Sequence, residues 1–237
     1  LTYNSVVHFF PLLIFCLWIE VSFSQTPNNN YWVFGDSAAI NWINPQSPQF
    51  FRSNVKSRCG TVSLYNDTFG LYLYANYNQV QSVNFGKLCI YNKYNSVLSN
   101  SDSVYGEDWY HSLLLLPQPG NDSISFLFSV GVVGIAPYGL HYSIINHKAN
   151  NDSGIVVQKN IQLNNLPAFD GLTAVRHGNG RDWWLIFKRY IPPPSLIYNN
   201  DFYVYLLDSS GVSGPLIQSI GTLHIDNGGQ LLFTKNG

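Results

Sequence analysis

Charged side chains are scarce in this sequence. Asp, Glu, Lys and Arg make up 11% of its 237 residues, against about 25% in an average soluble protein. The formal net charge is −1, so the chain has no field that would attract a nucleic acid or an anionic lipid surface. We therefore expect no nucleic-acid partner, and a surface hydrated mainly by neutral polar side chains.

Methionine is absent, and no stretch of helical length repeats apolar residues every 3.6 positions. Aromatic residues are abundant instead, at 16% of the chain. Aromatic side chains favour the pleated surface of a sheet. The composition therefore predicts an all-β fold.

A long hydrophobic run is also missing. Residues 1–24 are predicted to be a secretory signal peptide, because Phe9 to Trp18 form a short apolar core and Ser22 and Ser24 are small residues that suit cleavage. This core is shorter than the roughly 20 residues of a membrane span. We expect a mature chain without a membrane span, secreted or displayed at the cell surface.

Cysteine is rare, and only Cys59 and Cys89 follow the predicted signal peptide. An exported chain meets an oxidising compartment, where a disulfide bond between these two residues is permitted. Two buried free thiols are the alternative interpretation.

A repeated hairpin organises the remainder of the chain. Residues 172–190 suggest two strands joined by a tight turn at Gly178-Asn-Gly180, and a looser copy lies upstream. Successive units open about 55–60 residues apart, at Cys59, Leu113, Leu172 and Gln230. The expected strands lie at 31–34, 39–43, 59–66, 71–78, 87–94, 112–117, 123–130, 139–146, 154–163, 172–178, 181–190, 201–208 and 215–221.

Four strands in a meander are typical of a propeller blade. We predict that residues 25–237 form a partial β-propeller, with blades at about 59–111, 112–171 and 172–228 and a further blade starting at 229. A closed ring needs about four to eight blades, so the ring is incomplete and we expect a segment of a longer protein whose C-terminal remainder is missing. Two Greek-key sandwiches would give a similar strand count without the matching hairpin positions.

Several motifs resemble a known group of proteins. The chain is similar to the N-terminal, β-propeller-like region of secreted proteins of Bacteroidota, of the type that carries a type IX secretion sorting domain or is associated with gliding motility. The matching motifs are Trp32-Val-Phe-Gly35, Ala39-Ile-Asn-Trp42, Gly139-Leu-His-Tyr-Ser-Ile-Ile-Asn146, Lys159-Asn-Ile-Gln-Leu163, Leu172-Thr-Ala-Val-Arg-His-Gly-Asn-Gly180, Asp182-Trp-Trp184, Phe202-Tyr-Val-Tyr-Leu-Leu-Asp-Ser-Ser-Gly-Val212 and Ile217-Gln-Ser-Ile-Gly221. The resemblance implies a propeller of the WD-repeat or lactonase type, and implies dedicated export machinery and surface attachment or release.

Polar side chains concentrate at the repeated hairpin. Arg176 and His177 end one strand, and Asp182 and Trp183 begin the next. We interpret these four residues as a structural network of the blade turn, because buried polar groups need partners. The alternative is catalytic, with His177 as a general base tuned by Asp182.

Other chemistry has less support. Val33-Phe-Gly-Asp-Ser37 resembles the nucleophile block of GDSL-type esterases, but no Asp-x-x-His block follows to supply the base. The histidines lack paired ligand spacing, and the turns at 208–211 and 226–229 lack a full calcium loop. We expect no metal and no cofactor.

Tyr72 and Tyr74 are predicted to share one face of a strand. There they would contact a sugar or peptide if exposed, or pack between blades if buried. The sequence as a whole predicts a non-catalytic binding, scaffold or adhesion module with an unknown extracellular protein or glycan ligand. An extracellular propeller hydrolase with a channel active site is the alternative.

Overall fold

The computed structural model describes residues 30–56, 60–66, 70–77, 87–107, 111–132, 136–168, 171–191, 198–224 and 231–233. The predicted signal peptide, Cys59, the turn at 226–229 and the predicted start of a further blade at 229 lie outside these residues. No helix in the described ranges is long and apolar enough to cross a membrane.

The described residues form four antiparallel sheets, each a meander in chain order. This confirms the predicted all-β class, and the only helical element is the single turn α1 (Ala149–Asp152) among the described residues. The first sheet contains β1 (Tyr31–Phe34), β2 (Asp36–Asn41) and β3 (Gln49–Lys56), and the second contains β4 (Thr61–Asn66), β5 (Gly70–Tyr77) and β6 (Leu88–Asn92). The third contains β7 (Leu113–Pro117), β8 (Ile124–Gly131), β9 (Gly139–Asn146) and β10 (Ile155–Gln162), and the fourth contains β11 (Thr173–Arg176), β12 (Trp183–Lys188), β13 (Asn199–Asp208) and β14 (Gly211–His224).

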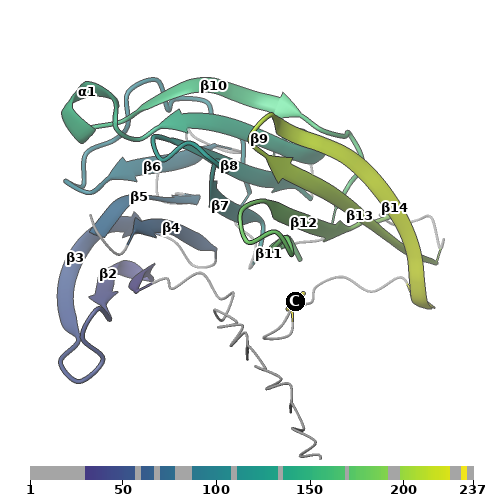
Figure 1. Ribbon diagram of the computed structural model, residues 1–237, viewed down its shortest axis with the longest axis horizontal. Helices are drawn as coiled ribbons and strands as arrows, with labels where there is room; N and C mark the ends of the chain where they lie inside the picture. Colours follow the sequence, from purple (N-terminus) through teal and green to yellow (C-terminus); the bar gives the residue numbers. More distant parts are fainter. Residues whose placement is uncertain are drawn as a thin grey trace, which may run out of the picture.

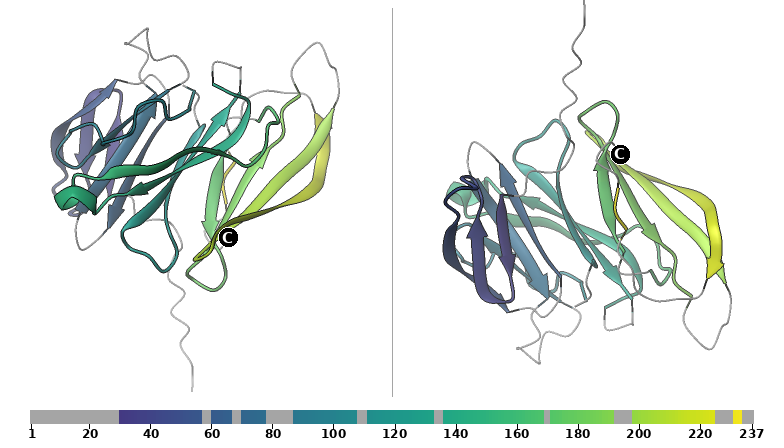
Figure 2. Two further views of the ribbon diagram at one scale, coloured as in Figure 1. Left: turned by 90° about the horizontal axis from the view of Figure 1, so that it is seen from above. Right: turned by 90° about the horizontal axis from the view of Figure 1, so that it is seen from below.

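The four sheets stand side by side in chain order (Figure 2). The last strands of the first, third and fourth sheets, β3, β10 and β14, lie along the outer arc in Figure 1, whereas the first strands β4, β7 and β11 lie nearer its concave side. First strands also meet across sheets, since β1 contacts β4 and β4 contacts β7. A parallel bridge between His111 and Gly171 joins the segments that lead into β7 and β11.

Each pair of neighbouring sheets encloses a hydrophobic core. We call the face that a sheet turns toward the preceding sheet its front face, and the opposite one its back face. Between the first two sheets lie Val33, Val55 and Tyr74, and between the second and third lie Leu73, Leu115 and Leu127. Phe128 of the third sheet and Phe187 of the fourth belong to the last of these cores. Every joint therefore places a back face on the next front face.

Neutral amides connect the sheets at the surface, as the low charge content led us to expect. Asn54 Nδ2 donates to the carbonyl of Asn95 at 2.7 Å, across the first joint. Asn160 Nδ2 donates to the carbonyl of Ser103 at 2.8 Å, and Asn164 Nδ2 donates to the hydroxyl of Tyr205 at 3.1 Å. Asparagine thus acts at these joints beside two ion pairs between the second and third sheets, Lys93–Asp152 and Lys159–Asp102.

Strand β3 (Gln49–Lys56) is not among the strands predicted from the sequence. In β3, Ser53 and Val55 are buried, whereas Arg52 and Asn54 are exposed. This alternation is typical of a half-buried strand. It went unrecognised because polar side chains occupy the exposed positions and Ser53 occupies a buried one.

Residues 59–111 were predicted to form a four-stranded blade, but the described part forms a three-stranded sheet. The segment after β6 makes isolated bridges, such as Tyr91 to Val97, and one of them reaches β10 from Ser99 to Ile155. Asn95, Asn100 and Ser103 adopt positive φ angles, which turn the chain repeatedly and prevent a regular strand.

Tyr72 and Tyr74 lie on opposite faces of the second sheet, contrary to the prediction from simple alternation. The pairing of β4 with β5 shifts register between Leu64 and Tyr65. Such a bulge adds one residue to a strand and reverses the faces beyond it. Tyr74 therefore packs in the first joint, and Tyr72 packs at the second.

Candidate functional site

The turn between β11 and β12 holds all four residues of the predicted network. The backbone N–H of His177 donates to the carbonyl of Asp182 at 2.8 Å, and the N–H of Gly180 donates to the carbonyl of His177 at 2.8 Å. Gly180 adopts a φ of 71°, a left-handed conformation that glycine takes without a steric cost. These bonds close the turn that the Gly-Asn-Gly sequence predicts.

Asn179 lies at the centre of this turn. Its Oδ1 accepts the N–H groups of Arg181 and Asp182 at 3.0 Å each, and its Nδ2 donates to Asp182 Oδ2 at 2.6 Å. The N–H of Asn179 donates to His177 Nδ1 at 3.1 Å. The imidazole and the carboxylate are therefore tied through Asn179, a residue that the sequence analysis did not single out.

Asp182 is buried, and its carboxylate accepts a hydrogen bond from Arg181 Nε at 2.8 Å. The hydrogen bonds from Arg181 and Asn179 lower the pKa of Asp182 because they stabilise the charged carboxylate. Arg176 stacks on the ring of Trp183, with the guanidinium carbon 3.9 Å from the ring centroid. All of these contacts hold the turn in shape, and His177 has no hydrogen bond to the Asp182 carboxylate among the described contacts.

A second polar cluster lies under the turns of the third sheet. His147 Nδ1 is 2.7 Å from Ser125 Oγ, and His147 Nε2 is 3.0 Å from the carbonyl oxygen of Asp122. A carbonyl can only accept, so Nε2 carries the hydrogen, and Nδ1 accepts the Ser125 hydroxyl. The ring also packs on Tyr72 of the second sheet, with 4.4 Å between ring centroids.

A serine and a histidine at this distance resemble a catalytic pair. Ser125 is 0% exposed and His147 is 4% exposed, so no substrate can reach either group in this conformation. The pair instead satisfies two buried polar side chains at the joint between the second and third sheets. The sequence analysis missed it because Ser125 lies on β8 and His147 directly follows β9, so the two residues form no local motif.

We expect the free energy of unfolding to fall as the pH is lowered from about 7.5 to 5. Burial lowers the pKa of both His147 and His141 below the usual value near 6.5. The unfolded chain then binds more protons in this range, so stability is fully present above about pH 6.5 and is lost as the pH falls toward the folded-state values. Urea unfolding at several pH values measures this loss.

His147→Gln should reduce this pH dependence, because it removes one of the buried imidazoles. The neighbouring carboxylate Asp122 has its pKa lowered by Lys148, so it titrates at more acidic pH and does not mask the effect. A stability that is equal at pH 5 and 7.5 would contradict the neutral, buried imidazoles.

The remaining candidate residues of the sequence analysis lie on ordinary strands and turns. Cys89 is a half-buried free thiol on β6, while Cys59 lies outside the described residues, so the pairing of the two cysteines stays a prediction. Ser37 lies on β2 of an antiparallel sheet, not in the parallel sheet of an esterase. Asp208 Oδ1 accepts the N–H of Ser210 at 2.7 Å in an ordinary hairpin turn. No group of three or more potential metal ligands gathers among the described side chains.

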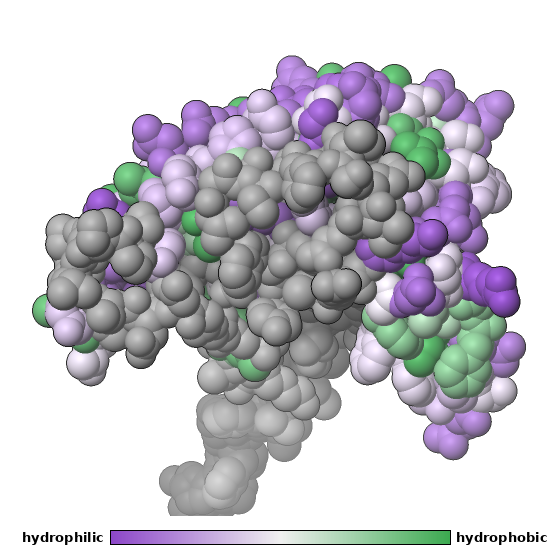
Figure 3. Space-filling model, turned by 180° about the vertical axis from the view of Figure 1, so that it is seen from behind, coloured by the Kyte–Doolittle hydropathy of each residue, from purple (hydrophilic) through white to green (hydrophobic). Residues whose placement is uncertain are grey.

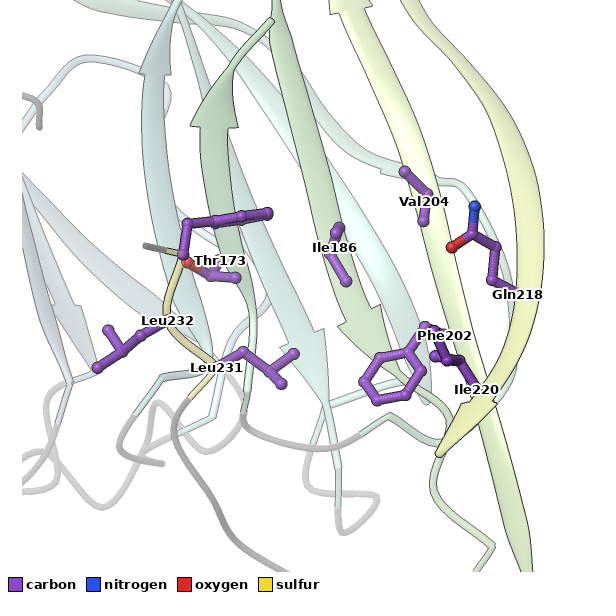
Figure 4. Close-up of a pocket in the computed structure, with 9 residues that line it drawn as sticks. Thr173, Ile186, Phe202, Val204, Gln218, Ile220, Leu231 and Leu232 are labelled. Carbon is purple, nitrogen blue, oxygen red and sulfur yellow. The ribbon is translucent and has the colours of Figure 1, made fainter. Parts of the chain in front are cut away.

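A pocket of about 210 Å³ lies on the back face of the fourth sheet. Figure 4 shows Leu231 pointing toward the sheet from a separate segment of the chain, while Leu232 points the other way. The lining is almost entirely apolar, with Gln218 and Thr173 as its polar members. It comprises Thr173, Ile186, Phe202, Val204, Gln218, Ile220, Leu231, Leu232 and Phe233.

The front face of the first sheet, which points away from the second sheet, is also open. Trp32 is 54% exposed and Phe50 is 76% exposed, and hydrophobic surface gathers at the lower right of Figure 3, where this sheet lies. The two ends of the row of sheets therefore share one property: each presents an apolar sheet face to solvent.

No family model matches this chain, and no significant match was found among curated proteins or solved structures. The site therefore has to be interpreted from its own geometry.

Proposed function

We propose that this chain is an exported, non-catalytic β-propeller segment of a larger cell-surface or secreted bacterial protein, and that it acts as a binding, scaffold or adhesion module. The observation that carries the proposal is the arrangement of the four sheets. Their first strands approach one another, and each back face packs on the next front face. Meander sheets placed radially around an axis have this arrangement.

The chemistry of the first strands favours binding over catalysis. A propeller hydrolase would place carboxylates or imidazoles on the strands that line its channel. In this chain β7 is Leu-Leu-Leu-Leu-Pro and β11 is Thr-Ala-Val-Arg. The polar clusters at Asn179 and His147 are used to hold turns and a joint.

Loops at the rim of a rigid framework commonly carry specificity. We infer an extracellular protein or glycan as the ligand class, and we retain residues 1–24 as the proposed export signal. Type IX secretion, gliding motility and surface attachment are part of the proposal only through the resemblance of the sequence motifs. The propeller hydrolase remains the second candidate, because His177 lies partly exposed at the end of β11.

Two variants of the β11–β12 turn test the non-catalytic assignment. Asn179→Ala should lower the free energy of unfolding by about 1–2 kcal/mol, since it removes the three hydrogen bonds of the Asn179 side chain, two of them to the buried Asp182. His177→Ala should cost less, because only one hydrogen bond to its ring is lost. Urea unfolding gives the stabilities, and assays with aryl esters and lactones give any hydrolysis.

We expect no hydrolysis above the buffer rate for the unaltered chain, and binding on glycan and extracellular-protein arrays that survives in His177→Ala. A chain that hydrolyses these substrates, together with a stable His177→Ala variant that does not, would overturn the proposal in favour of the hydrolase.

A further inference from the structure

The last strand of each sheet has one neighbour in its sheet, and its other edge needs partners for its N–H and C=O groups. On β3, the last strand of the first sheet, these partners come from the second sheet and the segment after it. The N–H of Asn54 donates to the hydroxyl of Tyr74 at 3.0 Å, and Asn95 Nδ2 donates to the carbonyl of Arg52 at 3.2 Å. The edge of β3 is therefore closed within the chain.

Residues 96–105 close the edges of the second and third sheets in the same way. The N–H of Leu98 donates to the carbonyl of Ile90 on β6 at 2.9 Å. The N–H of Val156 on β10 donates to the carbonyl of Ser99 at 3.0 Å. Three of the four sheets thus have partners at the edge of their last strand.

Strand β14 is the exception. It is the last strand of the fourth sheet and lies at its outer edge (Figure 1). Among the described contacts it forms hydrogen bonds with β13 alone, and each of residues 213–223 is exposed. The edge of β14 that points away from β13 therefore offers N–H and C=O groups to another extended strand.

The composition of β14 also favours pairing. Natural edge strands commonly carry charged side chains that keep other strands away, as β3 does with Arg52 and Lys56. None of the 14 residues of β14 is Asp, Glu, Lys or Arg. Leu216 is 57% exposed and Ile220 is 63% exposed. Pro215 removes one N–H donor near the start of the strand, and the run from 216 to 223 remains.

We propose that β14 pairs antiparallel with β14 of a second copy of this chain, about a two-fold axis at Gln218. The fourth sheets of the two copies then form one continuous sheet. This inference goes beyond the proposed function, because it uses the edge of one sheet and no ligand.

The face on which each side chain lies favours this register. Val204 pairs with Leu216 and Phe202 pairs with Gln218, and Ile220 lines the same pocket as Val204, Phe202 and Gln218. Leu216, Gln218 and Ile220 therefore share one face of the sheet. Directly opposed residues must lie on the same face, and an axis at Gln218 places Leu216 of each copy opposite Ile220 of the other.

A second copy fits this edge better than a strand of a different protein. Two apolar cross-strand pairs form about the axis, because β14 itself carries apolar residues at the matching spacing. No like charges oppose one another in the symmetric pair, and the neutral edge offers nothing to attract a charged strand. Pairing of one surface with itself about a two-fold axis is also the commonest symmetry of soluble oligomers.

The first experiment measures the mass of the full chain by sedimentation over a range of protein concentrations. We expect a concentration-dependent dimer. Ile220→Lys should raise its dissociation constant about tenfold, because both apolar pairs are lost. The matched control is Val157→Lys on β10, where a similarly exposed apolar side chain lies on a strand whose edge is closed; it should leave the constant unchanged. A monomer at every concentration, or equal effects of the two variants, would overturn the proposal.

The second experiment uses Gln218→Lys and Gln218→Glu, at an exposed position where neither side chain should disturb the sheet. Each variant alone should dimerise several-fold more weakly, since like charges would lie directly opposite each other. A mixture of the two should dimerise at least as tightly as the unaltered chain, with a lysine opposite a glutamate.

This mixture separates edge pairing from a contact through the open face of the fourth sheet, because only pairing about the proposed axis places position 218 of one copy against position 218 of the other. Weak association that the mixture does not restore would contradict the two-fold pairing. Neither experiment depends on ligand binding or hydrolysis, so failure here is distinguishable from failure of the proposed function.

Discussion

Gly139→Ala should destabilise the protein by about 2–5 kcal/mol. Gly139 begins β9 with a φ of 102°, and a Cβ built there would lie 2.0 Å from the carbonyl oxygen of Asn164. A left-handed conformation costs an alanine about 1–2 kcal/mol, and forcing atoms into a packed site costs about 1–3 kcal/mol more. Backbone atoms form the obstacle, so a side-chain rotation cannot relieve the overlap.

The matched control is Gly178→Ala in the β11–β12 turn. A Cβ at Gly178 would have no neighbour within 4 Å, and its φ lies outside the left-handed region. Urea unfolding should give nearly the same free energy for this variant as for the unaltered chain. A Gly139→Ala variant as stable as the control would show that β9 and the segment at Asn164 are not packed as described.

Phe187→Ala should cost about 3–5 kcal/mol, the usual range for a buried phenylalanine. Phe187 is 0% exposed in the core between the third and fourth sheets. Its ring stacks on Tyr203 with 5.3 Å between centroids. The substitution would leave a cavity in the joint, and thermal or urea unfolding measures the loss.

The same substitution at Phe50 provides the comparison. Phe50 is 76% exposed on the open front face of the first sheet, so Phe50→Ala should change the free energy of unfolding by less than about 0.5 kcal/mol. If the two variants were equally stable, the core between the third and fourth sheets would not be the source of stability that the fold implies.

Sequence patterns predicted the third and fourth sheets best. Strand β9 spans Gly139–Asn146, as expected at both ends, because strong turn signals flank an apolar, β-branched run. Alternation failed where a single residue changed the register, as at Tyr72. It also failed in β3, where hydrophobicity alone does not distinguish a strand with polar outward positions from a loop.

The candidate site was predicted in part. The turn residues Arg176, His177, Asp182 and Trp183 do lie together, since a hairpin brings its own ends into contact. The central role of Asn179 was missed because a glycine–asparagine–glycine turn does not specify which partners the amide will find. Ser125 and His147 were missed because only strand register brings them within hydrogen-bonding distance.

Disulfide trapping tests the central claim for the third and fourth sheets, that they meet at their first strands and diverge at their last strands. His111 and Gly171 are partners in a parallel bridge, and the N–H of Leu172 donates to the carbonyl of His111 at 3.0 Å. Adjacent strands lie about 4.8 Å apart, within the Cα separation that a disulfide bond spans. His111→Cys with Gly171→Cys should therefore form a bond on mild oxidation, detected by mass spectrometry of the digested protein, while Val157→Cys with Leu216→Cys on the last strands should not. A bond in the second pair and none in the first would contradict the account.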